Sequence, residues 1–483
     1  MPDDSPDGPS LAELEAAVQR SPGDAGAWEN LAFAYSSAGI HELAAEIQEH
    51  AVSLVPRGPY TRHRCASVLA MAKRFRDAAG HLREAIRLDP GEAYHSYRLG
   101  ALLAEAGDHA AAADCFRTYV EVMPALGPAW RRLAWALYAA GKFAEAIPVF
   151  EKAVGYEFES APLWAGLGSA YARTDQHSRA IQAYWLSLRF FPAQPRVFFE
   201  LGVSCGKLDR FEEAAAAYEV AARLDRVDVQ PRLALGSLLL DQGRPADALP
   251  HLRRAACLKP QDPYAWHILG DAHHDLGHTR AWVEAARQRV RVDPTSGEAR
   301  FSLGLVFHEA GRDRDAVRTF ARLLESEPGN ASVWCHLGVS LAVLGRLRLA
   351  EKVLREALRL DERFGGAWHN LGRVLWERRR PQPALGAFEK ATEYLPDFAP
   401  GWHELGRALH HLGRHAEAVA ACRRALGLDP RNAFTWRLLG HASALEKDGA
   451  GVLEVYEQLC ALDPLAAREF HETHVKGCPW ARL

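Results

Sequence analysis

The chain repeats itself every 34 residues. Counted from Ala25, thirteen consecutive 34-residue segments follow one another without insertion or deletion up to residue 466. The eighth position is Ala or Gly in every segment, and the position before it is Leu in all but one, where Cys65 stands. Position 20 is Ala in eleven segments, and position 32 is Pro in ten. A fixed period of this length is the signature of a repeat protein, in which each segment forms one supersecondary unit.

The pattern inside each segment predicts two helices. Apolar residues at positions 4, 7, 8 and 11 follow the helical period, and a second stripe at positions 20, 24 and 27 does the same. Position 15 is Gly in eight segments, as expected where a helix ends in a left-handed residue. Small residues at positions 8 and 20 allow close helix approach, while Trp or Phe at position 4 and Leu at position 7 fill the core. One hairpin cannot bury both stripes, so the segments should stack into a solenoid.

This pattern resembles the tetratricopeptide repeat family over residues 25–466. The fifth segment carries the family motif nearly intact, as Trp164, Leu167, Gly168, Tyr171, Ala180, Tyr184 and Pro192. The resemblance implies an all-α fold, a right-handed superhelical solenoid of about thirteen 34-residue helix-turn-helix units with N- and C-terminal capping helices. It also implies that the first helices line a long inner groove.

The ends are predicted to cap the array. Residues 1–24 should comprise a disordered acidic leader and a cap helix, for which Ser10 and Glu13 form a capping-box pattern. Residues 25–466 hold the repeats, and residues 467–483 are expected to form a second cap helix and a tail. With 24 residues before the repeats and 17 after them, no attached catalytic domain is expected.

Composition favours a soluble cytoplasmic protein. The formal net charge of −3 gives no global electrostatic reason to bind nucleic acid, and no apolar run long enough to cross a membrane occurs. The acidic start lacks the features of a secretory signal. The eight cysteines are widely spaced and form no CxxC pair, which indicates reduced thiols.

In the family, ligands meet positions 2, 5, 9, 12 and 13 of the first helix. The predicted partner-binding residues of the first six segments are Tyr60, His63, Tyr94, Tyr97, Arg131, Trp135, Tyr138, Arg173, Arg196, Phe199 and Lys207. Those of the later segments are Tyr264, His267, Asp271, His274, His308, His369, Arg373, Trp376, His403, Arg407, His410, His411, Arg437 and His441. Aromatic and charged side chains together suit recognition of a peptide. The alternative is that the aromatics pack against neighbouring helices and the charges are solvated.

The last three segments are basic at these positions, which favours a partner with an acidic segment. Two ligand sites known in the family are absent from the sequence. No segment has Lys at position 5 with Asn at position 9, as the dicarboxylate clamp requires. Only Asn30 and Asn370 would contribute to an asparagine ladder at position 6.

Metal and catalytic sites have little support. His267, Asp271 and His274 lie at i, i+4 and i+7 and are a weak metal candidate, since solvated histidines are the commoner outcome. His471, His474 and Cys478 have loosely zinc-like spacing but supply only three donors. Cys335, at position 5, should face the groove as the one repeat cysteine worth testing for reactivity.

No serine-hydrolase, nucleotide-binding or zinc-protease motif occurs, so no enzyme activity and no cofactor are expected. The sequence therefore favours a non-enzymatic scaffold that binds a protein or peptide segment in its groove, with no nucleic acid and no membrane insertion. The first alternative is a regulatory subunit that docks a separately encoded enzyme. The second is a metal- or anion-binding protein that uses the histidine-rich segments.

Overall fold

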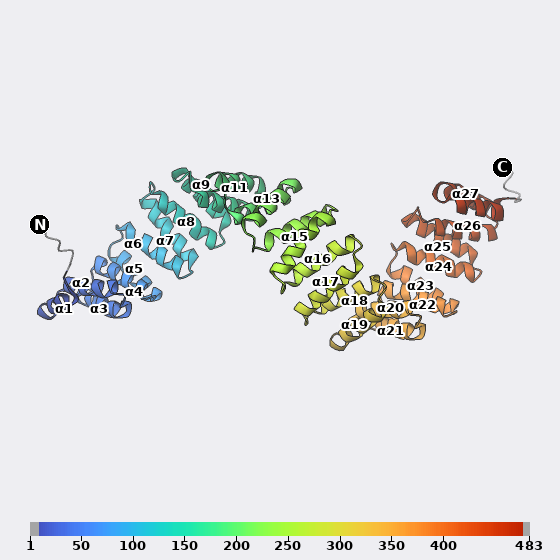
Figure 1. Ribbon diagram of the computed structural model, residues 1–483, viewed down its shortest axis with the longest axis horizontal. Helices are drawn as coiled ribbons and strands as arrows, with labels where there is room; N and C mark the ends of the chain where they lie inside the picture. Colours follow the sequence, from blue (N-terminus) through green and yellow to red (C-terminus); the bar gives the residue numbers. More distant parts are fainter. Residues whose placement is uncertain (1–8, 477–483) are drawn as a thin grey trace. The chain divides into compact units, whose positions relative to one another are not determined.

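The computed structural model describes residues 9–476 and divides into two compact halves, at Leu239 and Leu240 within helix α14 (Figure 1). The helices of the N-terminal half are α1 (Leu11–Arg20), α2 (Ala25–Ser37), α3 (His41–Leu54), α4 (Pro59–Met71), α5 (Phe75–Leu88), α6 (Ala93–Glu105), α7 (His109–Val122), α8 (Gly127–Ala139), α9 (Phe143–Tyr156), α10 (Ala161–Arg173), α11 (His177–Phe190), α12 (Pro195–Gly206), α13 (Phe211–Leu224) and the first part of α14 (Gln230–Asp241).

The C-terminal half continues the same alternation. Its helices are α15 (Pro245–Leu258), α16 (Pro263–Asp275), α17 (Thr279–Val292), α18 (Gly297–Glu309), α19 (Asp313–Ser326), α20 (Ala331–Val343), α21 (Leu347–Leu360), α22 (Gly365–Glu377), α23 (Pro381–Tyr394), α24 (Ala399–His411), α25 (His415–Leu428), α26 (Ala433–Leu445), α27 (Gly449–Leu462), α28 (Pro464–Phe470) and the π-helix η1 (His471–Val475).

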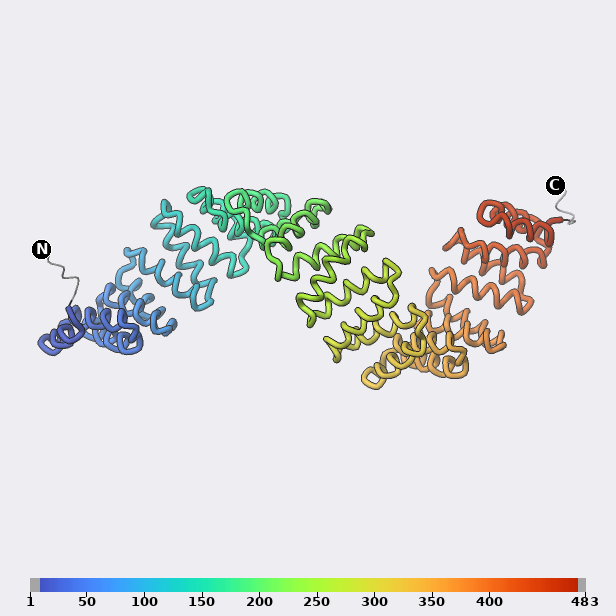
Figure 2. The backbone as a smooth tube through the Cα atoms, in the orientation of Figure 1, coloured from blue at the N-terminus to red at the C-terminus, as the bar shows by residue number. Residues whose placement is uncertain are grey.

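Thirteen hairpins run from α2–α3 to α26–α27, and no strand occurs between residues 9 and 476. Each first helix has 12 or 13 residues and each second helix has 14. Within each half the hairpins follow one another in chain order (Figure 2). The predicted all-α repeat fold is confirmed. The predicted leader lies largely in residues 1–8, outside the described part of the chain, as does the end of the predicted tail.

The turn inside every hairpin places one residue in the left-handed region. All eight glycines at position 15 have positive φ, for example +85° at Gly107. The other five hairpins reach the same conformation with larger residues, namely Lys73, Asp175, Asp209, Arg379 and Lys447. The turn geometry therefore does not depend on glycine, although glycine adopts it without steric cost.

In six hairpins glycine is required at position 8 because an aromatic or leucine side chain from position 24 lies on it. A Cβ at Gly304 would overlap the Phe320 ring, and one at Gly372 would lie 2.5 Å from Phe388. Phe320 and Phe388 are completely buried. In these hairpins the ring of the second helix thus packs directly on the backbone of the first helix at position 8.

Tryptophan at position 4 joins each hairpin to the one before it. In all eight hairpins with this residue, the indole Nε1 donates to the carbonyl oxygen six residues earlier, at 2.7–2.9 Å. These side chains are half-buried apart from the buried Trp436, and several of them, for example Trp334 and Trp402, pack against the core as predicted while part of the indole stays accessible. Arg62 replaces the indole and donates to the Pro56 carbonyl oxygen at 2.8 and 3.1 Å.

The capping box predicted at the N-terminus is present. The Glu13 amide donates to the Ser10 hydroxyl at 3.4 Å, and the Ser10 amide donates to the Glu13 carboxylate at 2.8 Å. At the other end, Phe470 of α28 is buried, and its ring lies so close to Gly440 that a Cβ there would overlap it. We propose that α1 and α28 cap the array, because each covers an apolar helix face that has no further hairpin beside it.

Replacing Gly304 with Ala should destabilise the protein, because the new methyl group would overlap the buried Phe320 ring. Overpacking of this kind costs about 1–3 kcal/mol. Gly270→Ala is the matched control at the same position, since its Cβ would meet nothing closer than 3.5 Å. That substitution should keep or raise stability, by up to about 1 kcal/mol from helix propensity. Equal melting temperatures for the two variants would contradict this account of position 8.

Candidate functional site

The residues at positions 2, 5, 9, 12 and 13 of the first helices, here called the first-helix face, are the predicted binding surface. In the N-terminal half the exposed members are Tyr60, Tyr94, Arg131, Trp135, Arg173, Arg196 and Lys207, and the half-buried ones are His63, Tyr97, Tyr138 and Phe199. In the C-terminal half, Tyr264, His274, Arg373 and His411 are exposed, and the half-buried ones are His267, Asp271, His308, Trp376, His403, Arg407, His410, Arg437 and His441.

Aromatic side chains on this face contact one another from helix to helix. The Tyr94 ring of α6 lies 5.4 Å from His63 of α4 and 6.0 Å from Tyr97, measured between ring centroids. His63 also lies beside buried His95, with their Nδ1 atoms 3.1 Å apart. These aromatic side chains therefore pack against neighbouring helices and also expose ring surface, so the two alternatives, packing and availability to a ligand, do not exclude each other here.

Two pockets meet at Trp135 of α8. One has a volume of about 480 Å³ and is lined by residues of α6–α8, including Phe116 and Arg131. The other, of about 450 Å³, lies between α8, α10 and α12. The indole is 38% exposed, and its ring centroid lies 5.3 Å from buried Phe150 and 5.8 Å from Tyr138. Trp135 thus packs against Phe150 and Tyr138 and remains partly exposed to solvent beside both pockets.

Small residues on α10 create the pocket between α8 and α12. Ala165, Gly166 and Ser169 occupy positions 5, 6 and 9, and all three line it. A Cβ at Gly166 would lie 2.7 Å from Phe150 and 2.9 Å from Trp135. Only this segment has Gly at position 6, and this glycine is the sequence signal for the pocket. Position 6 was considered above only as a site for asparagine. Charged Arg196 and Glu200 also line the pocket.

The basic character expected of the last hairpins is reduced by local pairing. Arg407 forms a salt bridge with Glu404 and lies over the Trp376 ring, 4.8 Å from its centroid. Arg437 is 3.9 Å from Glu469. Arg373 is exposed and beside it is a small pocket of about 90 Å³. Two of the three predicted arginines therefore already have a carboxylate partner.

Several predicted histidines are not cationic at neutral pH. Burial, with a smaller contribution from neighbouring His95 and His474, lowers the pKa of His63 and His441 to about 4. Burial also lowers the pKa of His403 and His410. These side chains consequently act as neutral hydrogen-bonding groups, as His403 does with the Thr435 hydroxyl at 2.9 Å.

Two predictions about exposure are wrong. His369 is only 9% exposed, since its ring packs near Phe388 and Phe398. Cys335 is 4% exposed and lies 3.6 Å from the Asn370 amide nitrogen, so it does not face an open groove. Burial raises the pKa of the Cys335 thiol, which makes it a poor nucleophile. In these two hairpins position 5 is covered by the next hairpin, which a single-segment pattern cannot show.

The histidine-rich hairpins do not assemble a metal-ligand set. His267 Nδ1 is 3.8 Å from an Asp271 carboxylate oxygen, whereas His274 contacts Asp275 at 3.2 Å and Glu309 at 3.7 Å. Among residues 9–476 no group of three or more His, Cys, Asp or Glu side chains is placed to hold a metal ion. His474 contacts His441 at 2.6 Å, and Cys478 lies outside the described residues.

Family comparison agrees with this geometry. A tetratricopeptide repeat model matches residues 66–128, 131–195, 309–363 and 369–433, which together are more than half of the chain. The chain belongs to the tetratricopeptide repeat family. A second model of the same family matches residues 229–272. Tetratricopeptide repeat proteins bind protein partners, so the chain is in general terms a protein-interaction scaffold. Within the described residues, no helix is long and apolar enough to cross a membrane.

Solved structures of similar fold include the APC/C hetero-tetramer Cut9-Hcn1, at 16% identity over 96% of this chain and 93% of that chain, with a TM-score of 0.40. The MamA protein is 24% identical over 35% of this chain and 92% of its own, with a TM-score of 0.33. Yeast Tom70 is 14% identical over 86% of this chain and 99% of its own, with a TM-score of 0.38. No curated protein sequence matches the chain.

Acid should weaken the fold through His369, because burial and, to a smaller extent, nearby Arg373 together lower the pKa of its side chain to about 4. Above pH 6.5 the side chain is neutral in both the folded and the unfolded chain. Below that pH the unfolded chain gains a proton first, so the free energy of unfolding should fall as pH drops from about 6.5 to 4, by on the order of 2–3 kcal/mol. His369→Leu should flatten this dependence in thermal melts between pH 7.5 and 4.5. An identical slope in both proteins would show that His369 contributes little.

Proposed function

We propose that the chain is a non-enzymatic scaffold that holds an extended or helical segment of a partner protein on the first-helix face of its N-terminal half. One large apolar side chain of that segment is proposed to occupy the pockets beside Trp135. The observation that carries the proposal is the exposed indole flanked by two pockets of about 450 and 480 Å³. Exposed, preorganised aromatic groups beside a pocket are typical centres of binding energy.

Contacts already in the protein hold the proposed anchor rigid. Trp135 is fixed by edge contacts with Tyr138 and Phe150, and Tyr138 in turn contacts Phe143 at 5.1 Å between ring centroids. A partner therefore loses little additional side-chain entropy of the scaffold on binding. Arg196 and Glu200 at the second pocket supply one charge of each sign for orienting the segment.

We also propose that a partner segment on the first-helix face of the C-terminal half is acidic, and this part of the proposal has less support. Arg407 and Arg437 pair with carboxylates of the chain, whereas Arg373 forms no salt bridge among the described residues. An acidic segment would therefore depend mainly on Arg373. The cytoplasmic location that we also propose is supported by the seven described cysteines, all of which are free thiols.

A second role for the same face is a regulatory subunit that docks a separately encoded enzyme. The two roles differ in whether the activity of a captured partner changes on binding, which an assay of that partner with and without the scaffold would reveal. Metal binding by the histidine-rich hairpins has less support, because His267 contacts the Asp271 carboxylate whereas His274 contacts that of Glu309.

Filling the pocket should abolish partner binding without unfolding the protein. Ser169→Phe places a ring in the cavity between α8 and α12, and Ser237→Phe is the matched control at position 9 of the seventh hairpin. Partners captured by the native protein from its source lysate and quantified by mass spectrometry should be lost with Ser169→Phe and with Trp135→Ala. Loss of a buried aromatic anchor typically costs 2 kcal/mol or more, which is about 30-fold in affinity. Retention of the same partners by both variants would refute this site.

A further inference from the structure

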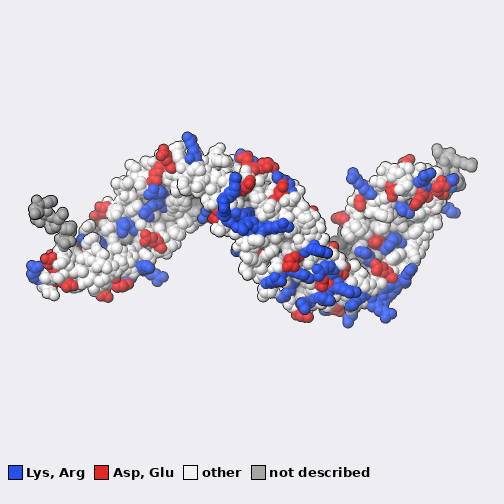
Figure 3. All heavy atoms as spheres, viewed as in Figure 1, with Lys and Arg blue, Asp and Glu red and all other residues white. Residues whose placement is uncertain are grey.

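A second surface carries an excess of positive charge on the opposite helices of the hairpins. Helices α17, α19 and α21 are the second helices of hairpins eight, nine and ten, and hold eleven Lys or Arg against six Asp or Glu, although the whole chain has a net charge of −3. In the view of Figure 3, blue side chains gather over this part of the C-terminal half. We call the exposed Lys and Arg of these three helices the basic face.

The acidic residues of these helices neutralise only part of this face. Glu284 pairs with Arg287 at 4.0 Å, Asp315 with Arg318 at 3.5 Å and Glu356 with Arg359 at 2.8 Å. Asp313 and Glu351 are buried, at 6% and 3% exposure, and Asp313 is engaged by His308. Glu351 pairs with Arg355 at 2.7 Å and with Arg378 and Arg380 of the next hairpin. Within residues 9–476 no salt bridge is formed by the exposed side chains of Arg280, Arg314, Arg322, Arg348 and Lys352. The unpaired cations thus lie on all three helices.

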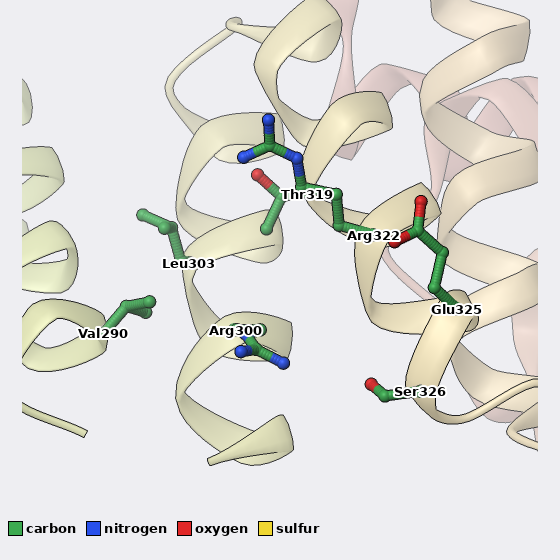
Figure 4. Close-up of a pocket in the computed structure, with 7 residues that line it drawn as sticks. All are labelled: Val290, Arg300, Leu303, Thr319, Arg322, Glu325 and Ser326. Carbon is green, nitrogen blue, oxygen red and sulfur yellow. The ribbon is translucent and has the colours of Figure 1, made fainter. Parts of the chain in front are cut away.

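A cavity opens between these helices where the tryptophan of position 4 is missing. In the ninth hairpin Arg300 occupies that position, and the cavity of about 490 Å³ beside it is lined by α17, α18 and α19 (Figure 4). In the fourth hairpin, which has tryptophan at position 4, the indole lies under the side chain at position 26, with the Trp130 ring centroid 4.1 Å from the Lys152 nitrogen. The substitution of arginine for tryptophan therefore both opens the space and places a cation in it.

The lining of the cavity suits a compact anion. Arg300 donates to the Pro294 carbonyl oxygen with one terminal nitrogen, which leaves its other N–H groups available. Arg322, at position 26, enters from α19 with its guanidinium directed toward Thr319 in Figure 4. The hydroxyl groups of Thr319 and Ser326 already donate to backbone carbonyl oxygens, at 2.8 and 2.9 Å. The two guanidinium groups, which Figure 4 shows toward opposite ends of the cavity, are therefore the donors offered to a ligand placed between them.

Glu325 also lines the cavity, but it forms no salt bridge with either arginine among the described residues. Figure 4 shows its carboxylate on the other side of the Arg322 stem from the guanidinium group. One carboxylate against two guanidinium groups leaves the cavity positive. A doubly charged tetrahedral group satisfies two such donors better than a single carboxylate does.

We propose that the basic face binds a phosphorylated acidic segment of a protein, with the phosphoryl group in the cavity between Arg300 and Arg322 and the flanking acidic residues on α17, α19 and α21. Single-stranded nucleic acid stacks its bases on exposed aromatic side chains, and α17, α19 and α21 expose none, which disfavours this class of partner. Leu349 is the one large apolar side chain there with high exposure, which gives an anionic membrane little to bury. The proposal does not depend on the surface around Trp135.

The test uses the full chain and a short fluorescent peptide with one phosphoserine flanked by Asp and Glu, compared with the same peptide carrying serine. By fluorescence anisotropy the phosphopeptide should bind about tenfold tighter or more, the advantage expected of charge-assisted contacts to two guanidinium groups. Arg322→Ala should remove most of that advantage. Arg300→Trp, which restores the residue of eight other hairpins, should remove it by filling the cavity while the protein stays folded by circular dichroism.

Matched variants separate the phosphoryl site from general charge. Arg424→Ala, at position 26 of the twelfth hairpin, should leave both affinities unchanged. Arg348→Ala should weaken both peptides alike. Equal binding of the two peptides by the native chain, or an unchanged advantage in both Arg322→Ala and Arg300→Trp, would overturn the proposal. Tighter binding of a single-stranded oligonucleotide or of phosphatidylserine vesicles than of the phosphopeptide would show that the partner class is wrong.

Discussion

The close approach of two helices at a residue with almost no side chain is the constraint on which every hairpin depends. The Phe320 ring lies on the backbone at Gly304, and the same contact recurs between Phe388 and Gly372. Because the ring is completely buried in these hairpins, position 8 can hold only Gly or Ala across the array, whereas the residue at position 24 differs from hairpin to hairpin. The remaining positions are left for joining hairpins and for binding. This division explains how thirteen segments keep one register while their surfaces diverge.

The surfaces diverge in two directions. First helices supply the aromatic surface around Trp135, where small residues on α10 leave room for a side chain from outside. Second helices supply the basic face, where Arg300 replaces an indole and leaves a charged cavity. In both places the feature arises where a segment departs from the commonest residue, with Gly166 at position 6 in the first and Arg300, one of three arginines at position 4, in the second. Departures from an otherwise strict pattern thus mark the sites that we propose are functional.

The fold could be predicted from sequence almost completely, because the pattern that specifies it is local and repeated thirteen times. The turn at position 15 and the small residue at position 8 follow from one segment read alone. Exposure at position 5 could not be predicted in the same way, since the next hairpin decides it. That hairpin buries His369 and Cys335 but leaves Arg131 open. The charge of the first-helix face in the last hairpins could not be predicted either. Burial keeps His441 and His403 neutral, and Glu404 neutralises Arg407.

The indole-to-carbonyl hydrogen bond also sets how the array responds to a pull along its length. It ties the start of one hairpin to the end of the one before, so hairpins that have it share tension with their neighbours. Ser96 and Phe198 stand at position 4 of the third and sixth hairpins and offer no equivalent donor. Under load the N-terminal half should part first at these two junctions, and the hairpins between them, which include Trp135, should detach as one block. The proposed binding surface would then keep its indole and lose the pocket wall that α12 supplies.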